Sequence, residues 1–346
     1  MSLARKTEIR REESDFELLE KYRWSARALS IRLPNLLELE IGGEERFSWI
    51  SGLRMAQGGL WAMDAKSLKN LFEFACRLGD WPMVLDAGKF LGDELECHEA
   101  LDLIEACARL GKMAEGLEIS IRWQLLLPCD LRFPRAHDRL LEDLHFRRRF
   151  PAIEGDEYGE PDLCLIPLSH RHLDDFFWQY FDPGISELCC LPEFVSREQW
   201  HAWLSGLYSD GDELPLAIIH REWGFVGCCH LVMHEGIGFL YYWMGKDFRG
   251  QGLAYRANRL LLSAAIESFG LRACYAKVFE HNLPSRRLLE RLGFECLDFR
   301  TIPDETEIFY RLGEDSRHVA CELRDFLARM KSDTSVAEPI YTEIKE

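Results

Sequence analysis

The sequence predicts an all-α domain over residues 1–147, followed by an α/β domain over residues 163–313. The first part reads mostly as helices, with apolar residues at helical spacing. The second part alternates short runs of strand formers with helical patterns. Between them, residues 148–162 are charged and carry prolines and glycines, a composition typical of a linker. At 346 residues the chain is long enough for two such cores.

The N-terminal part contains a near-repeat of 32 residues. Arg77-Leu78-Gly79-Asp80 and Arg109-Leu110-Gly111-Lys112 each follow an apolar helical pattern and precede a second one. This resembles the helical hairpins of tetratricopeptide proteins, whose repeats are near 34 residues. A generic antiparallel helical bundle is the alternative. Under either interpretation this domain is a scaffold, a surface for a homodimer or a docking module for an acceptor peptide.

The α/β part can be followed element by element. Prolines and glycines such as Pro183-Gly184 mark turns, and strand formers or apolar helical faces mark the elements between them. After the last strand, residues 314–346 predict one more amphipathic helix and a polar tail from Ser332. The expected order is strand 163–168, helices 171–181 and 197–207, strands 216–220, 225–234 and 238–244, a helix from Leu253, strand 273–279, helix 284–292 and strands near 296–299 and 306–312.

One junction in this order predicts a binding site for phosphate. The strand formers of Tyr241–Met244 give way to a loop with two glycines, and a helical pattern follows at once. Glycines let main-chain N–H groups approach an anion, and the first turn of a helix offers unpaired N–H groups. The loop lacks the Gly-Lys-Ser/Thr ending of a P-loop and the three spaced glycines of a dinucleotide fingerprint.

A second motif lies downstream. Asn282-Leu283-Pro284-Ser285 follows the strand at 273–279, opens a helix and is followed by Gly293-Phe294. The two motifs together resemble the GNAT acyltransferases, in the style of the enzymes that acetylate the N-termini of ribosomal proteins. In that family the loop reads Gln/Arg-x-x-Gly-x-Gly/Ala, met here by Arg249, Gly252 and Ala254. The second motif reads Asn-x-x-Ser/Ala and then Gly-Phe.

The resemblance covers residues 163–313 and implies the GNAT fold, a mixed central sheet flanked by helices. It also implies acyl-CoA, acetyl-CoA or a longer one, as co-substrate. Met244 would contact the pantetheine and thioester through its main chain, and Asn282 would bind the pantetheine arm. The pyrophosphate would lie on Arg249, Gly250, Gln251, Gly252, Leu253 and Ala254.

The catalytic groups are less defined. The acceptor amine attacks the thioester directly, so a base must keep it neutral and a main-chain N–H must hold the oxyanion. Many relatives carry a tyrosine seven residues after the asparagine as the acid, where this chain has Leu289, and a glutamate base where it has Phe239. Both departures leave open a degenerate, non-catalytic member. The candidate acid is Ser285, whose alternative role is a helix cap; the candidate bases are Glu280, His230, His234, Glu235, His281 and a bound water.

Composition restricts the partners. A formal net charge of −17 and a pI near 5.2 disfavour nucleic acid and anionic membranes, and favour a cationic amine or a basic peptide. The twelve cysteines show no CxxC spacing, so we expect buried thiols and no metal site. The sequence shows no targeting segment and no apolar run long enough to span a membrane, so we expect a cytoplasmic protein.

The sequence therefore predicts an acyl-CoA-dependent N-acyltransferase acting on a peptide or protein amine. One alternative is a GNAT-like maturase that attaches a longer fatty acyl chain to a lysine or ornithine side chain. The others are a small-amine acetyltransferase and a non-catalytic acyl-CoA-binding module. A group of aromatic residues is either core or the lining of an acyl tunnel: Phe176, Phe177, Trp178, Tyr180, Phe181, Phe239, Tyr241 and Tyr242.

Overall fold

The computed structural model describes residue 37 and residues 43–149, 151–180, 182–189, 194–209, 211–299, 306–313 and 319–332. The chain divides into two compact units, Met1–Cys107 with Glu118–Pro134, and Ala108–Leu117 with Arg135–Glu346. Three predicted features lie outside the described residues. They are the part of the helical domain before residue 43, except residue 37; the aromatic residue Phe181; and the polar tail after Ser332. Within the described ranges, no helix combines the length and the apolar character needed to cross a bilayer.

The described part of the N-terminal region, from residue 43 onward, consists mainly of helices, as expected. Gly79 and Gly111 follow two of them in the left-handed conformation, with φ of 67° and 79°, so each ends a helix where the near-repeat predicts a turn. Gly88 lets neighbouring helices approach closely, because a Cβ there would lie 2.7 Å from a methyl carbon of Leu103. The relation to tetratricopeptide repeats stays a prediction. The helices are α3 (Gly43–Ala56), η1 (Gln57–Ala62), α4 (Ala65–Leu78), α5 (Trp81–Leu91), η2 (Gly92–Glu94), α6 (Cys97–Arg109) and α7 (Met113–Leu126).

The second unit is built on a mixed eight-stranded sheet of order β1-β2-β3-β4-β5-β6-β8-β7. Neighbouring strands are antiparallel except β5 and β6, which are parallel. This is the mixed sheet that the sequence predicts for the α/β domain. The strands are β1 (Ile153–Glu154), β2 (Leu163–Pro167), β3 (Glu213–His220), β4 (Gly224–His234), β5 (Ile237–Met244), β6 (Ala273–Phe279), β7 (Glu295–Cys296) and β8 (Glu307–Gly313).

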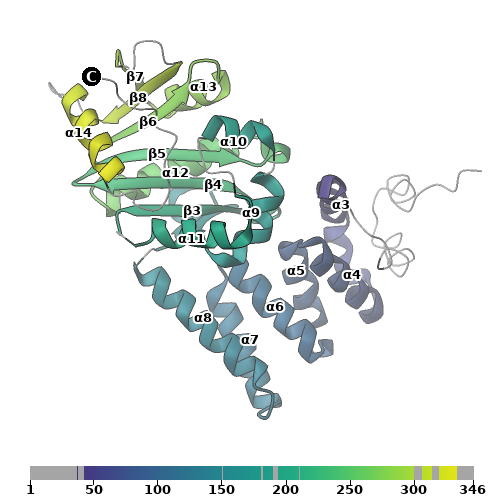
Figure 1. Ribbon diagram of the computed structural model, residues 1–346. Helices are drawn as coiled ribbons and strands as arrows, with labels where there is room; N and C mark the ends of the chain where they lie inside the picture. Colours follow the sequence, from purple (N-terminus) through teal and green to yellow (C-terminus); the bar gives the residue numbers. More distant parts are fainter. Residues whose placement is uncertain are drawn as a thin grey trace, which may run out of the picture. The chain divides into compact units, whose positions relative to one another are not determined.

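Helices cover both faces of the sheet (Figure 1). Alternate residues of β5 point to opposite faces. Trp243 meets Phe176 of α9 with ring centroids 5.2 Å apart, and Phe239 stacks on Phe326 of α14 at 6.3 Å, so α9 and α14 share one face. Helix α12 lies behind the strands in Figure 1 and buries Ala257 and Leu261. The remaining elements are α8 (Arg132–Arg149), η3 (Gly155–Tyr158), η4 (His170–His172), α9 (Leu173–Tyr180), α10 (Pro183–Cys189), α11 (Arg197–Leu207), η5 (Lys246–Phe248), α12 (Leu253–Ser268), α13 (Leu283–Arg291) and α14 (Val319–Ser332).

Two expectations require correction. The stretch 148–162 is not simply a linker, because β1 within it pairs with β2, and the buried Glu160 forms ion pairs with Arg256 and Arg259 of α12. The prolines and glycines of this stretch belong to tight turns. A linker has the same composition, so composition alone does not separate the two. Pro183-Gly184, expected as a turn, begins α10 instead, since proline is well suited to the first turn of a helix.

Candidate functional site

The site begins where β5 and β6 separate. Their pairing covers Ile237, Gly238 and Phe239, opposite Ala273–Tyr275, and stops there. Strand β5 continues to Met244 paired only with β4, and β6 continues to Phe279 paired only with β8. The two strands therefore enclose a V that is closed at Phe239 and Tyr275 and open toward Met244.

Strand β5 presents main-chain hydrogen-bonding groups along this V. The N–H of Gly245 donates to Val226 O at 3.0 Å, and antiparallel pairing alternates from residue to residue. Leu240, Tyr242 and Met244 consequently direct their N–H and C=O groups away from β4. Leu240 takes part in the pairing with β6, so Tyr242 and Met244 are the residues that face the V, where Met244 O accepts from Arg249 Nε at 3.2 Å. Such an edge can bind an extended ligand that carries amides, as an added strand would be bound.

The open end of the V leads to the glycine loop. Gly252 has φ 78° and ψ 0° and is the N-cap of α12, and a Cβ added at Gly250 or Gly252 would meet nothing within 4 Å. The N–H of Arg256 makes the first bond of the helix, to Gly252 O at 3.2 Å. Among the described residues, no group accepts from the N–H of Leu253 or Ala254. These amides and the helix dipole form a suitable anion site.

The polar side chains of this loop already have protein partners. The guanidinium of Arg249 pairs with Asp182 at 2.8 Å and donates to Met244 O at 3.2 Å. Gln251 Nε2 donates to Asp247 O at 3.1 Å. These two side chains therefore shape the loop, and the groups available to an anion are main-chain amides.

The second motif lies across the V from β5. Asn282 is the N-cap of α13, and its Oδ1 accepts from the N–H of Ser285 at 3.3 Å. The alternative role of Ser285 as the cap is therefore wrong. Its hydroxyl is instead hydrogen-bonded to Tyr242 Oη, which also lies 3.4 Å from Ser285 O. Burial is the main reason that the pKa of Tyr242 is raised to about 12.

His230 lies on the opposite face of the sheet. It is directly across from Tyr241 in the β4–β5 register, and its ring stacks on Tyr241 with centroids 5.7 Å apart. Its Nε2 is 2.8 Å from a carboxylate oxygen of Glu213, at the start of β3. The pair brings an imidazole next to a carboxylate, a combination of groups that acid–base chemistry can use. Both side chains keep some solvent access.

The other candidate bases do not lie beside His230 and Glu213. Glu280 follows the end of β6, where its N–H donates to Thr306 O at 2.6 Å, and its side chain is exposed. His281 stacks on Phe279. His234 and Glu235 lie at the β4–β5 turn, beyond the closed end of the V, where His234 contacts Asp212 at 3.2 Å.

Sequence reasoning missed Glu213 and Tyr242 as members of the site. Glu213 opens a strand that begins three residues earlier than expected, and nothing in the sequence marks its partner. The sequence places Tyr242 in the aromatic group. Its contact with Ser285 depends on how β5 and α13 pack, which no local pattern shows. The alternation along β5 does predict that Tyr241 and Tyr242 face opposite sides.

Two members of the aromatic group, Phe176 and Phe239, are packed among other aromatic rings. The ring of Phe176 lies 5.0 Å from Tyr180 and 5.5 Å from Trp200, and Phe176 is 1% exposed. Phe239 is also 1% exposed, beneath Phe326. These rings fill the space that an acyl tunnel through them would need.

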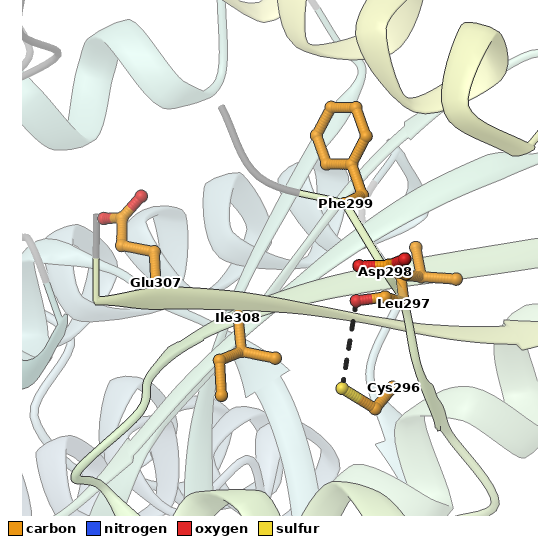
Figure 2. A pocket seen from close by; sticks show the side chains of 6 residues that line it. All are labelled: Cys296, Leu297, Asp298, Phe299, Glu307 and Ile308. Carbon is orange, nitrogen blue, oxygen red and sulfur yellow. Dashed lines mark hydrogen bonds between the residues drawn. The ribbon is translucent and has the colours of Figure 1, made fainter. Parts of the chain in front are cut away.

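A cavity of about 320 Å³ lies away from the V, at the β7–β8 edge of the sheet (Figure 2). Figure 2 shows Cys296 directed at Leu297 O, and Glu307 pairs with Lys277 at 2.6 Å. Within the part of the chain that the structure describes, no three His, Cys, Asp or Glu side chains gather as metal ligands. The cavity is lined by Cys296, Leu297, Asp298, Phe299, Glu307 and Ile308.

Comparison with known proteins finds a family to which the domain that holds the V is similar. Residues 162–295 match the family model described as an acetyltransferase (GNAT) domain, which confirms the resemblance expected from the two motifs. Alpha/beta-tubulin-N-acetyltransferase 9 of Mus musculus is 26% identical over 100 residues. That alignment covers 29% of this chain and 42% of the relative, so the chain spans less than half of that protein.

Two solved structures with a similar domain can be compared. One, from Salmonella typhimurium, modifies the N-terminal serine of ribosomal protein L7/L12; it is 16% identical, covers 47% of this chain and 99% of its own, and has a TM-score of 0.40. The other is RimJ of Mycobacterium smegmatis in complex with CoA-disulfide. It is 20% identical, covers 48% of this chain and 89% of its own, and has a TM-score of 0.38.

Proposed function

We propose, from the premise that residues 162–295 carry a GNAT acetyltransferase domain, that this protein transfers an acetyl group from acetyl-CoA to an amine of a peptide or protein. The observation that carries the proposal is the V between β5 and β6, which leads to the glycine loop before α12. The loop amides would hold the pyrophosphate. The pantetheine would extend along the open edge of β5, on Tyr242 and Met244.

The closed end of the V supports a short acyl group. An acyl chain in the V would point toward Phe239 and Tyr275, which are 1% and 0% exposed and lie beneath α14. Space for many methylenes would require these rings to move, at a packing cost of a few kcal/mol. Acetyl-CoA therefore fits the site better than a fatty acyl-CoA, and we favour acetylation over lipidation.

The two faces of β5 suggest a division of the chemistry. His230 and Glu213 lie on the face of α9 and α14, where the acceptor amine would approach, and His230 would take its proton. Ser285 lies on the other face, where its hydroxyl would protonate the departing CoA thiolate. A main-chain N–H of the open edge would hold the oxyanion between them.

An α-amine or a lysine amine of a peptide is preferred over a small metabolite amine. The acidic chain would attract cationic acceptors of either kind. The helical region supports the larger acceptor, because hairpin arrays provide extended surfaces for peptides. This preference is the part of the proposal that an acceptor panel tests directly.

The test is a transfer assay with acetyl-CoA and three acceptors: a peptide with a free α-amine, the same peptide with its α-amine blocked and one lysine, and a polyamine. Mass spectrometry of the products and the release of free CoA thiol would be measured together. We expect acetylated peptide in the first or second reaction. Modification of the polyamine alone would indicate a small-amine enzyme. Binding of acetyl-CoA without transfer to any acceptor would contradict an enzymatic role.

A further inference from the structure

We propose that Tyr242 is the positioning residue for Ser285 and returns to it the proton that Ser285 gives to the CoA thiolate. This inference rests on the proposed acetyl transfer and assigns a role within that site. Tyr242 is the residue of β5 whose side chain reaches across to the element that follows β6.

Three contacts fix Ser285. Its N–H is bound by Asn282 Oδ1, and Tyr242 Oη contacts both its hydroxyl and its carbonyl oxygen. A serine hydroxyl otherwise rotates among staggered positions. Either hydroxyl can donate in this contact. In the proposed relay Tyr242 Oη–H donates to Ser285 Oγ, which leaves the serine proton to point toward the thioester in the V.

Tyr242 belongs to the V by its main chain as well as by its side chain. Its N–H and C=O lie on the open edge of β5, and Cys189 Sγ of α10 lies 3.9 Å from that carbonyl oxygen. Helices α12 and α13 meet on the same face, where the guanidinium of Arg291 lies 3.9 Å above the ring of Tyr255. The phenol and the serine hydroxyl therefore lie beside the path along which the pantetheine would run.

The proton count closes. When the tetrahedral intermediate collapses, the C–S bond breaks and its electron pair goes to sulfur. Ser285 Oγ–H gives its proton to that sulfur, and Tyr242 Oη–H gives its proton to Ser285 Oγ. The phenolate regains a proton from water, and the proton that the amine lost leaves through His230 on the other face. The sum is amine plus thioester to amide plus thiol.

The environment keeps Tyr242 protonated between turnovers. Burial raises the pKa of its phenol to about 12, and the hydrogen bond with Ser285 offsets only part of that rise. At neutral pH the group is therefore a neutral phenol, which is able to donate its proton in the contact with Ser285. A phenolate in its place would accept from Ser285 and turn the serine proton away from the V.

The experiment compares Tyr242→Phe with Tyr241→Phe in the full chain. Both variants lose one phenolic oxygen from adjacent positions of β5, but Tyr241 faces His230 and not Ser285. Steady-state transfer of acetyl from acetyl-CoA to a peptide amine, acetyl-CoA binding by calorimetry and thermal unfolding would be measured for both. Ser285→Ala and the double variant Tyr242→Phe/Ser285→Ala complete the set.

We expect Tyr242→Phe to lower kcat by roughly tenfold or more, with acetyl-CoA affinity within about twofold of the wild type. Tyr241→Phe should have a smaller effect on kcat. Because Tyr242 acts through Ser285, the double variant should be no slower than Ser285→Ala. A purely structural role would instead lower affinity or unfolding temperature along with kcat.

The failures are distinguishable. A wild-type chain that transfers acetyl groups while Tyr242→Phe keeps its kcat overturns the relay alone. The relay is also overturned if the decrease in kcat in Tyr242→Phe/Ser285→Ala equals the product of the decreases in the two single variants. A wild-type chain that transfers no acetyl group overturns the proposed function and the relay together. Should Tyr242→Phe unfold, an unchanged kcat in Ser285→Ala would by itself overturn the relay.

Discussion

Tyr241 and Tyr242 show at the residue scale how one strand serves two sides of a reaction. The ring of Tyr241 stacks on His230, and the hydroxyl of Tyr242 contacts Ser285. Their side chains point apart only because strand residues alternate between faces. This places the proposed base and the proposed acid on opposite sides of the strand along which the thioester would lie.

His230→Gln should lower kcat by about 10² or more, because general base catalysis contributes at least that much. Glu213→Gln keeps the shape of the neighbouring side chain and removes its charge, so we expect a smaller loss of kcat than in His230→Gln. His98→Gln, at an exposed histidine of α6, is the control. Equal activity of all three variants would exclude His230 as the base.

The sequence predicts the glycine loop and Asn282 because each is a local pattern of adjacent residues. Gly252 must adopt a positive φ and Asn282 must cap α13, and both requirements are visible in a few consecutive letters. Tyr242 with Ser285, and Glu213 with His230, are separated by many residues and meet only through sheet register and helix placement. No local pattern encodes such contacts.

At the scale of elements, the short turn before β2 holds the helix of the glycine loop. Arg256 of α12 pairs with Glu160 at 2.5 Å and also with Asp162, and Arg259 pairs with Glu160. Glu160 is buried, so these bonds are better shielded from solvent than an ordinary surface pair. The composition of residues 148–162 predicts a turn or linker but carries no information on which helix the turn contacts.

Ala254 offers a test in which stability and binding should change independently. The substitution Ala254→Glu, in the first turn of α12, should stabilise the helix by about 0.3–1 kcal/mol, because a negative charge there interacts favourably with the helix dipole. The same charge would repel a pyrophosphate, so we expect acetyl-CoA affinity to fall tenfold or more while the unfolding temperature stays level or rises.

Ala254→Gln is the matched control, with the same shape and no charge. Calorimetric titration and thermal unfolding would be measured for both variants. If Ala254→Glu and Ala254→Gln bind acetyl-CoA equally well, the anion does not lie on the first turn of α12.

At the scale of the whole molecule, the chain is strongly acidic, with a formal net charge of −17. A cationic acceptor would be attracted over long range, and the proposed anionic co-substrate would have to be held by the local field of the loop. In the helical region, Gly79 and Gly111 each follow a helix with a positive φ. A role for this region in docking the acceptor stays a prediction.

Salt should therefore discriminate between acceptors. Raising the ionic strength from low salt to about 0.5 M should increase KM severalfold for a peptide rich in lysine and arginine, because screening removes the attraction. KM for a neutral peptide of equal length should change little. A parallel change for both peptides would show that net charge plays no part in acceptor binding.

The central claim is that acyl-CoA lies in the V with its pyrophosphate on the glycine loop. The most direct measurement is calorimetric titration of acetyl-CoA into the wild type, Gly252→Trp and Gly270→Trp. Both glycines flank α12, have φ near 75° (78° and 73°) and face open space, so each substitution should cost a similar strain of about 1 kcal/mol. We predict that the wild type and Gly270→Trp bind and Gly252→Trp does not. Equal binding by all three, or no binding by the wild type, would contradict the account.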